Sequence, residues 1–267
     1  MEHHLKLHVL ASGSRGNASI VEDARTGRGV LVDCGICKRD ALTRCDETGF
    51  DVANLEAILV THEHTDHTKG LGVLLRGLAK QGVRPPVYVN GAVRAASSEL
   101  AKLEGAFDLR ELAAGDALSL AGMQVHPFAT SHDAAFSCGF RFEADGDALG
   151  FMTDTGVVTG AAHEALRGVR LLALEANHDP RMLVDGPYPY PVKRRIAGDE
   201  GHLSNGQAAD ELRTLLSDDL EQVVAMHVSQ NNNDYRLPVD ALAAVLAQEG
   251  HPARVQAAYQ QQLVGVS

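Results

Sequence analysis

The segment VTHEHTDHTKG, residues 60–70, constrains this chain more than any other feature. It places His62, His64, Asp66 and His67 within six positions, directly after a run of apolar residues. His62 and His64 are two positions apart in an extended segment, so their rings can point to the same side. Imidazole and carboxylate groups at this spacing are typical of a metal site and not of a solvated loop.

Two metals need more ligands than this cluster supplies, since even a single catalytic zinc takes three protein ligands and keeps one position open. The chain offers three further candidates, each at the end of an apolar strand: His132 in FATSHD, Asp154 in GFMTDTG and His227 in VAMHVSQ. A side chain at a strand end is held rigidly and still faces the rim of a sheet. We therefore expect these three residues to join the cluster.

The composition is that of a soluble globular protein, with 45% apolar and 22% charged residues among 267. No segment approaches the ~18 apolar residues of a membrane helix, and the N-terminal sequence lacks the apolar core of a signal peptide. Four cysteines are too few for a disulfide framework and suit a reducing compartment. We expect a cytoplasmic protein without a membrane partner, in which Cys34 and Cys37 are incidental thiols.

The net charge of −11 counts against a broad nucleic-acid-binding surface, because phosphate binding needs clustered Lys and Arg. It does not exclude a local site. Two bound divalent cations would add positive charge at the point where an anionic substrate has to bind.

Helical and strand patterns alternate to the end of the chain without a linker, which predicts one layered α/β domain over residues 1–267. Strands are expected at 5–12, 55–60, 87–90, 169–176, 221–227 and 253–259, and within 123–133 and 136–156. Helices are expected at 38–49, 71–82, 92–105, 161–168, 205–218 and 238–250. Ser204 and Gln207 have the spacing of a capping box at a helix start.

The order H-x-H-x-D-H, then a distant His, an Asp and a His, resembles the metallo-β-lactamase superfamily. Within it, LASGSRGNA, THEHTDHTKG, LEANHD, GPYPYPVKRRI, GHLSN and HVSQNNN resemble the YycJ/WalJ-like branch over residues 10–233. The resemblance implies a four-layer αββα sandwich with a dinuclear metal site at the sheet rim. It assigns His62, His64 and His132 to one metal, Asp66, His67 and His227 to the other, and Asp154 to both.

Two divalent ions that share a water lower its pKa and generate a bridging hydroxide nucleophile, so the site predicts hydrolysis. An oxidative role is disfavoured, because di-iron flavoprotein relatives have a carboxylate where this chain has His64. Imidazole and carboxylate ligands suit zinc, which we expect, and manganese as the alternative.

GHLSNGQAADEL (201–212) resembles the second histidine motif of tRNA 3′-end-processing nucleases, in which a histidine touches the scissile phosphate. The resemblance gives this role to His202. LEAN (174–177) resembles a neighbouring acidic motif, in which Glu175 would orient His202. The predicted catalytic residues are thus Asp66, His202 and Glu175. The alternative is that His202 only helps to cap the helix near Ser204.

Two polar segments are candidates for substrate binding. A Gly-bearing turn after the first strand can present backbone N–H groups to an anion, and the densest basic run of the chain can guide a phosphate backbone. The candidate residues are Ser12, Ser14, Asn17, Lys193, Arg194 and Arg195.

These observations favour a metal-dependent phosphodiesterase, since the branch is associated with DNA exonuclease activity. The substrate would be nucleic acid, with DNA favoured over RNA, and a homodimer is one expected way to complete a shallow binding groove. The ligands alone also permit an acyl hydrolase of a small thioester, lactone or lactam. A third hypothesis is a metal-binding scaffold without catalysis.

Overall fold

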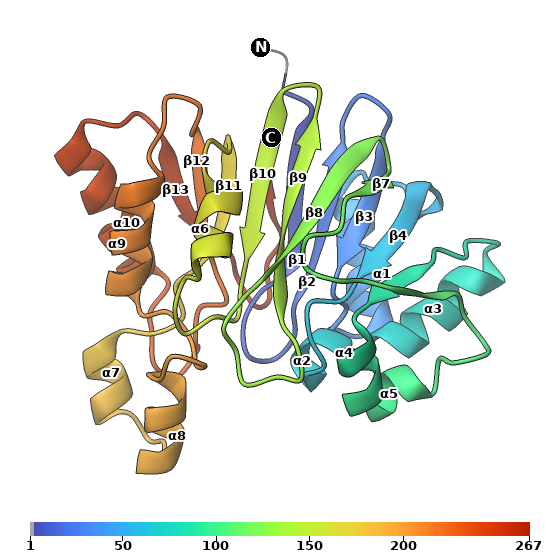
Figure 1. The fold of residues 1–267 in the computed structure, drawn as a ribbon, viewed down its shortest axis with the longest axis horizontal. Helices are drawn as coiled ribbons and strands as arrows, with labels where there is room; N and C mark the ends of the chain where they lie inside the picture. The colour runs from blue at the N-terminus through green and yellow to red at the C-terminus, as the bar shows by residue number, and fades with distance from the viewer. Residues whose placement is uncertain (1–2) are drawn as a thin grey trace.

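The computed structural model describes residues 3–267, which form two seven-stranded sheets packed face to face with helices outside both (Figure 1). The first sheet has the order β14 (Val264–Val266), β1 (Leu5–Ala11), β2 (Ala18–Asp23), β3 (Arg28–Val32), β4 (Leu55–Leu59), β5 (Val87–Val89) and β6 (Leu109–Glu111). The second has the order β13 (Arg254–Ala257), β12 (Gln222–Met226), β11 (Leu171–Glu175), β10 (Asp147–Met152), β9 (Cys138–Ala144), β8 (Met123–Ala129) and β7 (Leu118–Leu120).

The helices lie outside the sheets or at their lower rim (Figure 1). They are α1 (Lys38–Thr48), α2 (Thr65–Thr68), α3 (Leu71–Lys80), α4 (Gly91–Ala96), α5 (Ser98–Ala101), α6 (Gly160–Leu166), α7 (Pro180–Asp185), α8 (Tyr190–Ile196), α9 (Asn205–Leu215) and α10 (Arg236–Glu249), with a 3-10 turn at Val52–Asn54. Helices α1 and α3 bury their apolar side chains against the first sheet, and α6, α9 and α10 bury theirs against the second. The predicted four-layer αββα sandwich is confirmed.

The alternation of side chains along the strands divides the apolar residues between the layers. In β1, Leu5, Leu7 and Val9 point into the space between the sheets, whereas Leu10 faces the helices. This is the period of two that an extended strand imposes. Because both faces of each sheet are covered, the strands are apolar almost throughout.

Strand direction decides where the polar strand ends meet. Strands β3 to β6 are parallel, as are β10 to β13 in the other sheet. Carboxyl ends of parallel strands lie at one edge of a sheet, which is where α/β folds place their ligands. In Figure 1 this is the lower rim, where α2 lies and from which α7 and α8 project. Among residues 3–267, no helix has the length and apolar character needed to cross a membrane.

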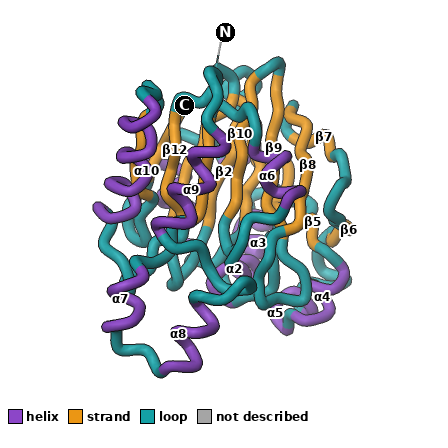
Figure 2. Tube along the Cα trace, turned by 60° about the vertical axis from the view of Figure 1, so that its left-hand side comes forward, coloured by secondary structure: helices purple, strands orange, loops and turns teal. Residues whose placement is uncertain are grey.

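Several elements differ from the sequence expectations. The helix expected at 92–105 is broken into α4 and α5 at Ser97, whose hydroxyl accepts a hydrogen bond from the Leu100 N–H and so starts a new helix. Helices α7 and α8 were not predicted, because both are short and begin beside a proline. They form an arm that stands out from the body of the protein (Figure 2). The predicted capping box of Ser204 and Gln207 is confirmed.

Candidate metal centre

The structure brings all seven predicted ligands together at the rim. Two groups match the predicted metal positions, each with its ligand atoms within 4.8 Å of one another: His62, His64 and His132, and Asp66, His67 and His227. Asp154 lies between them, with Oδ1 3.7 Å from Nε2 of His132 and Oδ2 3.3 Å from Nε2 of His67. The geometry is that of two adjacent cation positions with a shared carboxylate.

The donor atoms fit divalent cations. Nε2 of His62, Oδ2 of Asp154 and Nε2 of His227 are buried and have no hydrogen-bond partner in the part of the chain that the structure describes. A buried polar atom without a partner costs about 1–3 kcal/mol, so three at one point need a common explanation. A cation at each position would supply the missing partner to all three.

The loop that carries the cluster is fixed by close backbone contacts. The Asn17 N–H donates to the carbonyl oxygen of Asp66 (2.8 Å), and the His67 carbonyl accepts from the Cys34 N–H (2.8 Å). At Gly35, a Cβ atom would lie 1.5 Å from the Asp66 carbonyl oxygen, so only glycine allows this approach. The start of the chain and the end of β3 therefore hold the ligand loop in place.

Three residues that follow strands at the site have positive φ angles, a backbone conformation that residues other than glycine rarely adopt. Asp33, Asp154 and His227 have φ values of 59°, 57° and 53°. Such residues cost on the order of 1–3 kcal/mol each and persist where the surroundings over-determine them, often at functional sites. At these positions the turn of the backbone aims the side chain from the end of its strand into the rim.

Most of the predicted ligand histidines are held through the ring nitrogen that faces away from the cluster of donor atoms. His67 Nδ1 donates to Oδ2 of Asp33 (2.7 Å), and Thr61 Oγ1 donates to the same oxygen (2.7 Å) and contacts His62 Nδ1 (3.0 Å). Such partners fix the tautomer and increase the basicity of the ligand. Sequence reasoning missed Asp33 and Thr61, although Asp33 follows an apolar strand just as Asp154 does.

Glu175, at the end of β11, is fully buried and organises the second group. Its Oε1 accepts from Nδ1 of His202 (2.8 Å) and Nδ1 of His227 (3.1 Å), and its Oε2 accepts from the N–H groups of Thr155 (2.9 Å) and Leu203 (3.3 Å). Burial alone would raise the pKa of Glu175, but the neighbouring histidines lower it to about 2. Glu175 thus remains a carboxylate that positions two imidazole rings.

The electrostatics differ between the two positions. Burial lowers the pKa of His62 and of His132, so both are held neutral, the state that binds a metal. Burial would also lower the pKa of His67 and of His227, but neighbouring carboxylates outweigh this effect. Asp154, Asp33 and Asp66 raise the pKa of His67, and Asp154 with Asp66 and Glu175 raises that of His227 to about 10.

The carboxylates respond in the opposite sense. Burial would raise the pKa of Asp66, but His67 and His227 lower it to about 2, and the same histidines lower that of Asp154 well below its usual value. The site therefore carries its carboxylates ionised, and a cation at the second position would replace the protons of two histidines.

A cleft of about 340 Å³ opens beside the ligands. His64, Asp66, His132, Asp154, His202 and His227 line it together with Ser14, Tyr188, Arg195 and Ile196, so α8 forms one wall. His202 lines the cleft, while the helix cap near it is made by Ser204, whose hydroxyl accepts from the Gln207 N–H (3.2 Å). The capping alternative thus does not account for the His202 side chain.

The predicted substrate residues are spread over several environments. Ser14 and Arg195 line the cleft, Arg194 is exposed on α8, and Lys193 donates to the Val184 carbonyl oxygen (2.5 Å). Asn17 is buried, with Nδ2 2.9 Å from Nε2 of His67.

Ser12 needs a correction. It is fully buried, and its hydroxyl accepts a hydrogen bond from the His227 N–H (2.7 Å). It therefore supports a ligand strand instead of lining the cleft.

Comparison with known proteins places this site in a family. The sequence model described as "Beta-lactamase superfamily domain" matches residues 28–228. The exodeoxyribonuclease YycJ of Bacillus anthracis is 33% identical over 246 residues, which cover 92% of this chain and 90% of that protein. The exodeoxyribonuclease WalJ of Streptococcus pneumoniae is 32% identical, with coverage of 91% and 88%.

The solved structures agree on the fold. The metallo-beta-lactamase fold protein YhfI from Bacillus subtilis superimposes with a TM-score of 0.73 at 14% identity, over 98% of this chain and 99% of that one. At this identity the likeness supports the fold alone. With the family model and two relatives that match nearly end to end, the chain belongs to the beta-lactamase superfamily, in the branch of YycJ and WalJ.

Proposed function

We propose that the protein is a dinuclear-metal-dependent phosphodiesterase that degrades DNA from an end. The observation that carries this proposal is the likeness, over about nine-tenths of both chains, to two proteins named exodeoxyribonucleases. The convergence of seven donor side chains at one rim supports it. Both observations favour a metal-dependent hydrolase over a scaffold without catalysis.

The proposed ligands are His62, His64 and His132 for the first cation, Asp66, His67 and His227 for the second, and Asp154 for both. We propose zinc as the metal, with manganese as the alternative. When bound, such cations supply a nucleophile at neutral pH and neutralise charge on a phosphoryl oxygen.

The side chains of this chain supply the rest of the chemistry. The His202 Nδ1 atom is engaged by Glu175, which leaves Nε2 to hydrogen-bond the phosphate or donate a proton to the leaving oxygen. Asp66 is partly open to the cleft, and we propose that it orients the attacking water as well as binding a cation. Glu175 is fully buried, so we propose that it acts through His202 and His227 and not by contact with the substrate.

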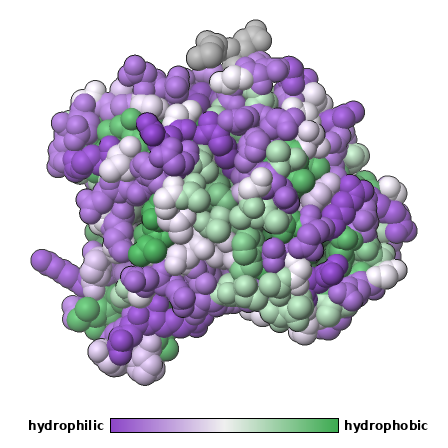
Figure 3. Space-filling view, in the orientation of Figure 1, coloured by the Kyte–Doolittle hydropathy of each residue, from purple (hydrophilic) through white to green (hydrophobic). Residues whose placement is uncertain are grey.

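DNA would enter along the wall formed by α8. Ser14 and Arg194 are exposed members of the predicted binding set, and Lys193 lies next to Arg194 on α8. Val184, Tyr190 and Val192 are exposed apolar residues of the arm. The arm lies at the lower left of Figure 3, where apolar and polar surface are mixed. We propose that a second copy of the chain completes the groove. We also propose that the chain is a single domain and that it works in the cytoplasm. The four free cysteines support this location, because a reducing compartment keeps thiols free.

The test is a cleavage assay on end-labelled single- and double-stranded DNA and RNA, with zinc or manganese supplied in turn. A thioester and a β-lactam are assayed beside them, and Asp154→Ala serves as the inactive control. We expect release of mononucleotides from DNA and loss of turnover in the variant. Turnover of the acyl substrates alone would reject the nuclease proposal.

A further inference from the structure

Four of the five proposed ligand histidines have a partner on the ring nitrogen that faces away from the cation. The pairs are His62 with Thr61, His67 with Asp33, His132 with the Gly201 carbonyl oxygen, and His227 with Glu175, at 2.7 to 3.1 Å. Ligand histidines in metalloproteins almost always have such a partner. The fifth histidine is therefore expected to have one as well.

His64 is the fifth. Its Nδ1 faces the first metal position, 3.2 Å from Nε2 of His132, so its Nε2 is the atom that needs a partner. The nearest carboxylate oxygen is Oδ1 of Asp133, at 4.0 Å. This oxygen is buried and has no hydrogen-bond partner among residues 3–267, and it also lies 3.5 Å from Nε2 of His132. Since Nε2 of His132 faces the first metal position, Nε2 of His64 is the neighbouring ring nitrogen that can donate a proton to Oδ1 of Asp133.

The rest of Asp133 is anchored. Its N–H donates to the Glu200 carbonyl oxygen (2.9 Å), and its Oδ2 pairs with the guanidinium of Arg195. Arg195 comes from α8, which forms the wall of the cleft. Asp133 therefore connects that wall to the first metal position.

We propose that Asp133 is a positioning residue that orients His64. With a cation on Nδ1, the proton of His64 lies on Nε2, and Oδ1 of Asp133 accepts it. Closing the gap from 4.0 Å to hydrogen-bond distance takes about 1 Å, a small rotation of two side chains. Through Oδ2 the same carboxylate holds Arg195, so the arm of α7 and α8 is coupled to the occupancy of the first position. The inference rests on the proposed ligand set.

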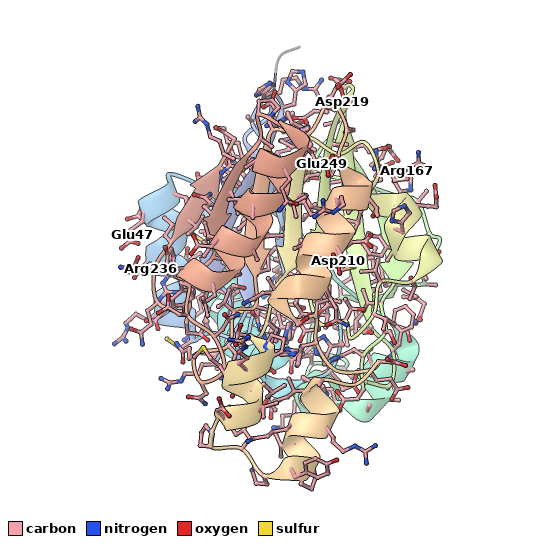
Figure 4. The ribbon with its side chains drawn as sticks, turned by 90° about the vertical axis from the view of Figure 1, so that its left-hand side faces the viewer. Glu47, Arg167, Asp210, Asp219, Arg236 and Glu249 are labelled. Atoms are coloured by element: carbon pink, nitrogen blue, oxygen red, sulfur yellow. The ribbon has the colours of Figure 1, made fainter. Side chains whose placement is uncertain are left out.

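Metal binding tests this directly, without an activity assay. Cobalt(II) is titrated into metal-free protein, and its visible absorption reports the coordination of each equivalent. We expect Asp133→Ala to lower the cobalt(II) affinity of the first position by about 10–100-fold and to alter the absorption spectrum of the cobalt bound there. Asp133→Asn keeps an acceptor for His64 and is expected to restore most of the affinity. Asp219→Ala is the matched control, since Asp219 lies at the opposite end of the molecule (Figure 4).

A second measurement uses the wild-type protein and therefore does not depend on whether a variant folds. In the zinc-loaded protein, imidazole nitrogen NMR should show the His64 proton on Nε2 with slow solvent exchange. Fast exchange, or wild-type affinity and spectrum in Asp133→Ala, would overturn the inference. Absence of metal binding by the wild-type protein would instead overturn the ligand set, and this inference with it.

Discussion

The Nδ1 atom of His202 lies 2.8 Å from Oε1 of Glu175, a carboxylate that is fully buried beneath the cleft. This contact fixes the imidazole ring while its other edge faces the substrate space. Because His202 is not one of the seven proposed ligands, its chemistry can be separated from metal binding.

We therefore expect His202→Ala to lower kcat by about 10²- to 10⁴-fold on DNA, the usual contribution of a general acid. Its metal content should equal that of the wild-type protein. Steady-state kinetics and metal analysis of the same preparation check both expectations. The control is His126→Ala, since His126 lies on β8 and is partly exposed away from the cleft. Loss of metal together with activity would instead make His202 a ligand.

Glu175→Gln is expected to act on two histidines together. The same Oε1 atom accepts from Nδ1 of His227, so the amide weakens the orientation of a ligand as well as that of His202. Affinity for the second cation should fall by about 10–100-fold, and kcat should fall even when metal is in excess. Calorimetric zinc titration and single-turnover kinetics measure the two effects. A variant with reduced kcat and unchanged metal affinity would limit Glu175 to His202.

Where one motif carries several donors, spacing along the chain predicted which side chains the structure brings together. His62, His64, Asp66 and His67 are adjacent in sequence, and apolar strands point to the remaining ligands. The two-sheet fold followed from the family resemblance, because alternating helices and strands are shared by many α/β layers.

What the sequence could not predict depends on contacts between distant segments. Asp33 and Asp133 are single carboxylates without a motif, and they approach the histidine rings only because the end of β3 and the loop after β8 meet the histidine segment in the fold. The burial of Ser12 depends likewise on its contact with His227, which follows β12 and is 215 residues away in sequence. Ser97 interrupts a helical pattern because a local hydroxyl cap competes with helix continuation.

A buried ion pair stabilises the rim opposite the predicted metal centre. Asp147 and Arg170 form a buried two-pronged ion pair, with N–O distances of 2.8 and 2.7 Å. Oδ2 of Asp147 also accepts from the N–H groups of His4 and Leu5 (2.9 Å each), which ties β1 to β10. Breaking a buried pair from one side costs about 3–5 kcal/mol. We expect this loss for Asp147→Asn in urea unfolding at pH 7.

The pH dependence of that loss has a definite sign. Burial would raise the pKa of Asp147, but Arg170 and the N–H groups of Leu5 and His4 lower it overall. A depressed carboxyl pKa stabilises the fold above the unfolded value of about 4, and this contribution is lost as the pH falls through the folded value. The difference in unfolding free energy between wild type and Asp147→Asn should therefore shrink below about pH 4. Asp219→Asn, from the same end, should show no such difference at either pH.

Thiol reactivity follows from burial. Cys37 is exposed, whereas Cys34, Cys45 and Cys138 are buried. Burial raises the pKa of Cys34 and of Cys45 to about 12 and that of Cys138 further, so these three thiols are neither accessible nor ionised at pH 8. A disulfide-exchange reagent should titrate roughly one thiol quickly in the native protein and all four after unfolding in guanidinium. Cys37→Ser should remove the fast phase and leave the slow one. Two or more fast thiols in the native protein would contradict the packing of α1 against the first sheet.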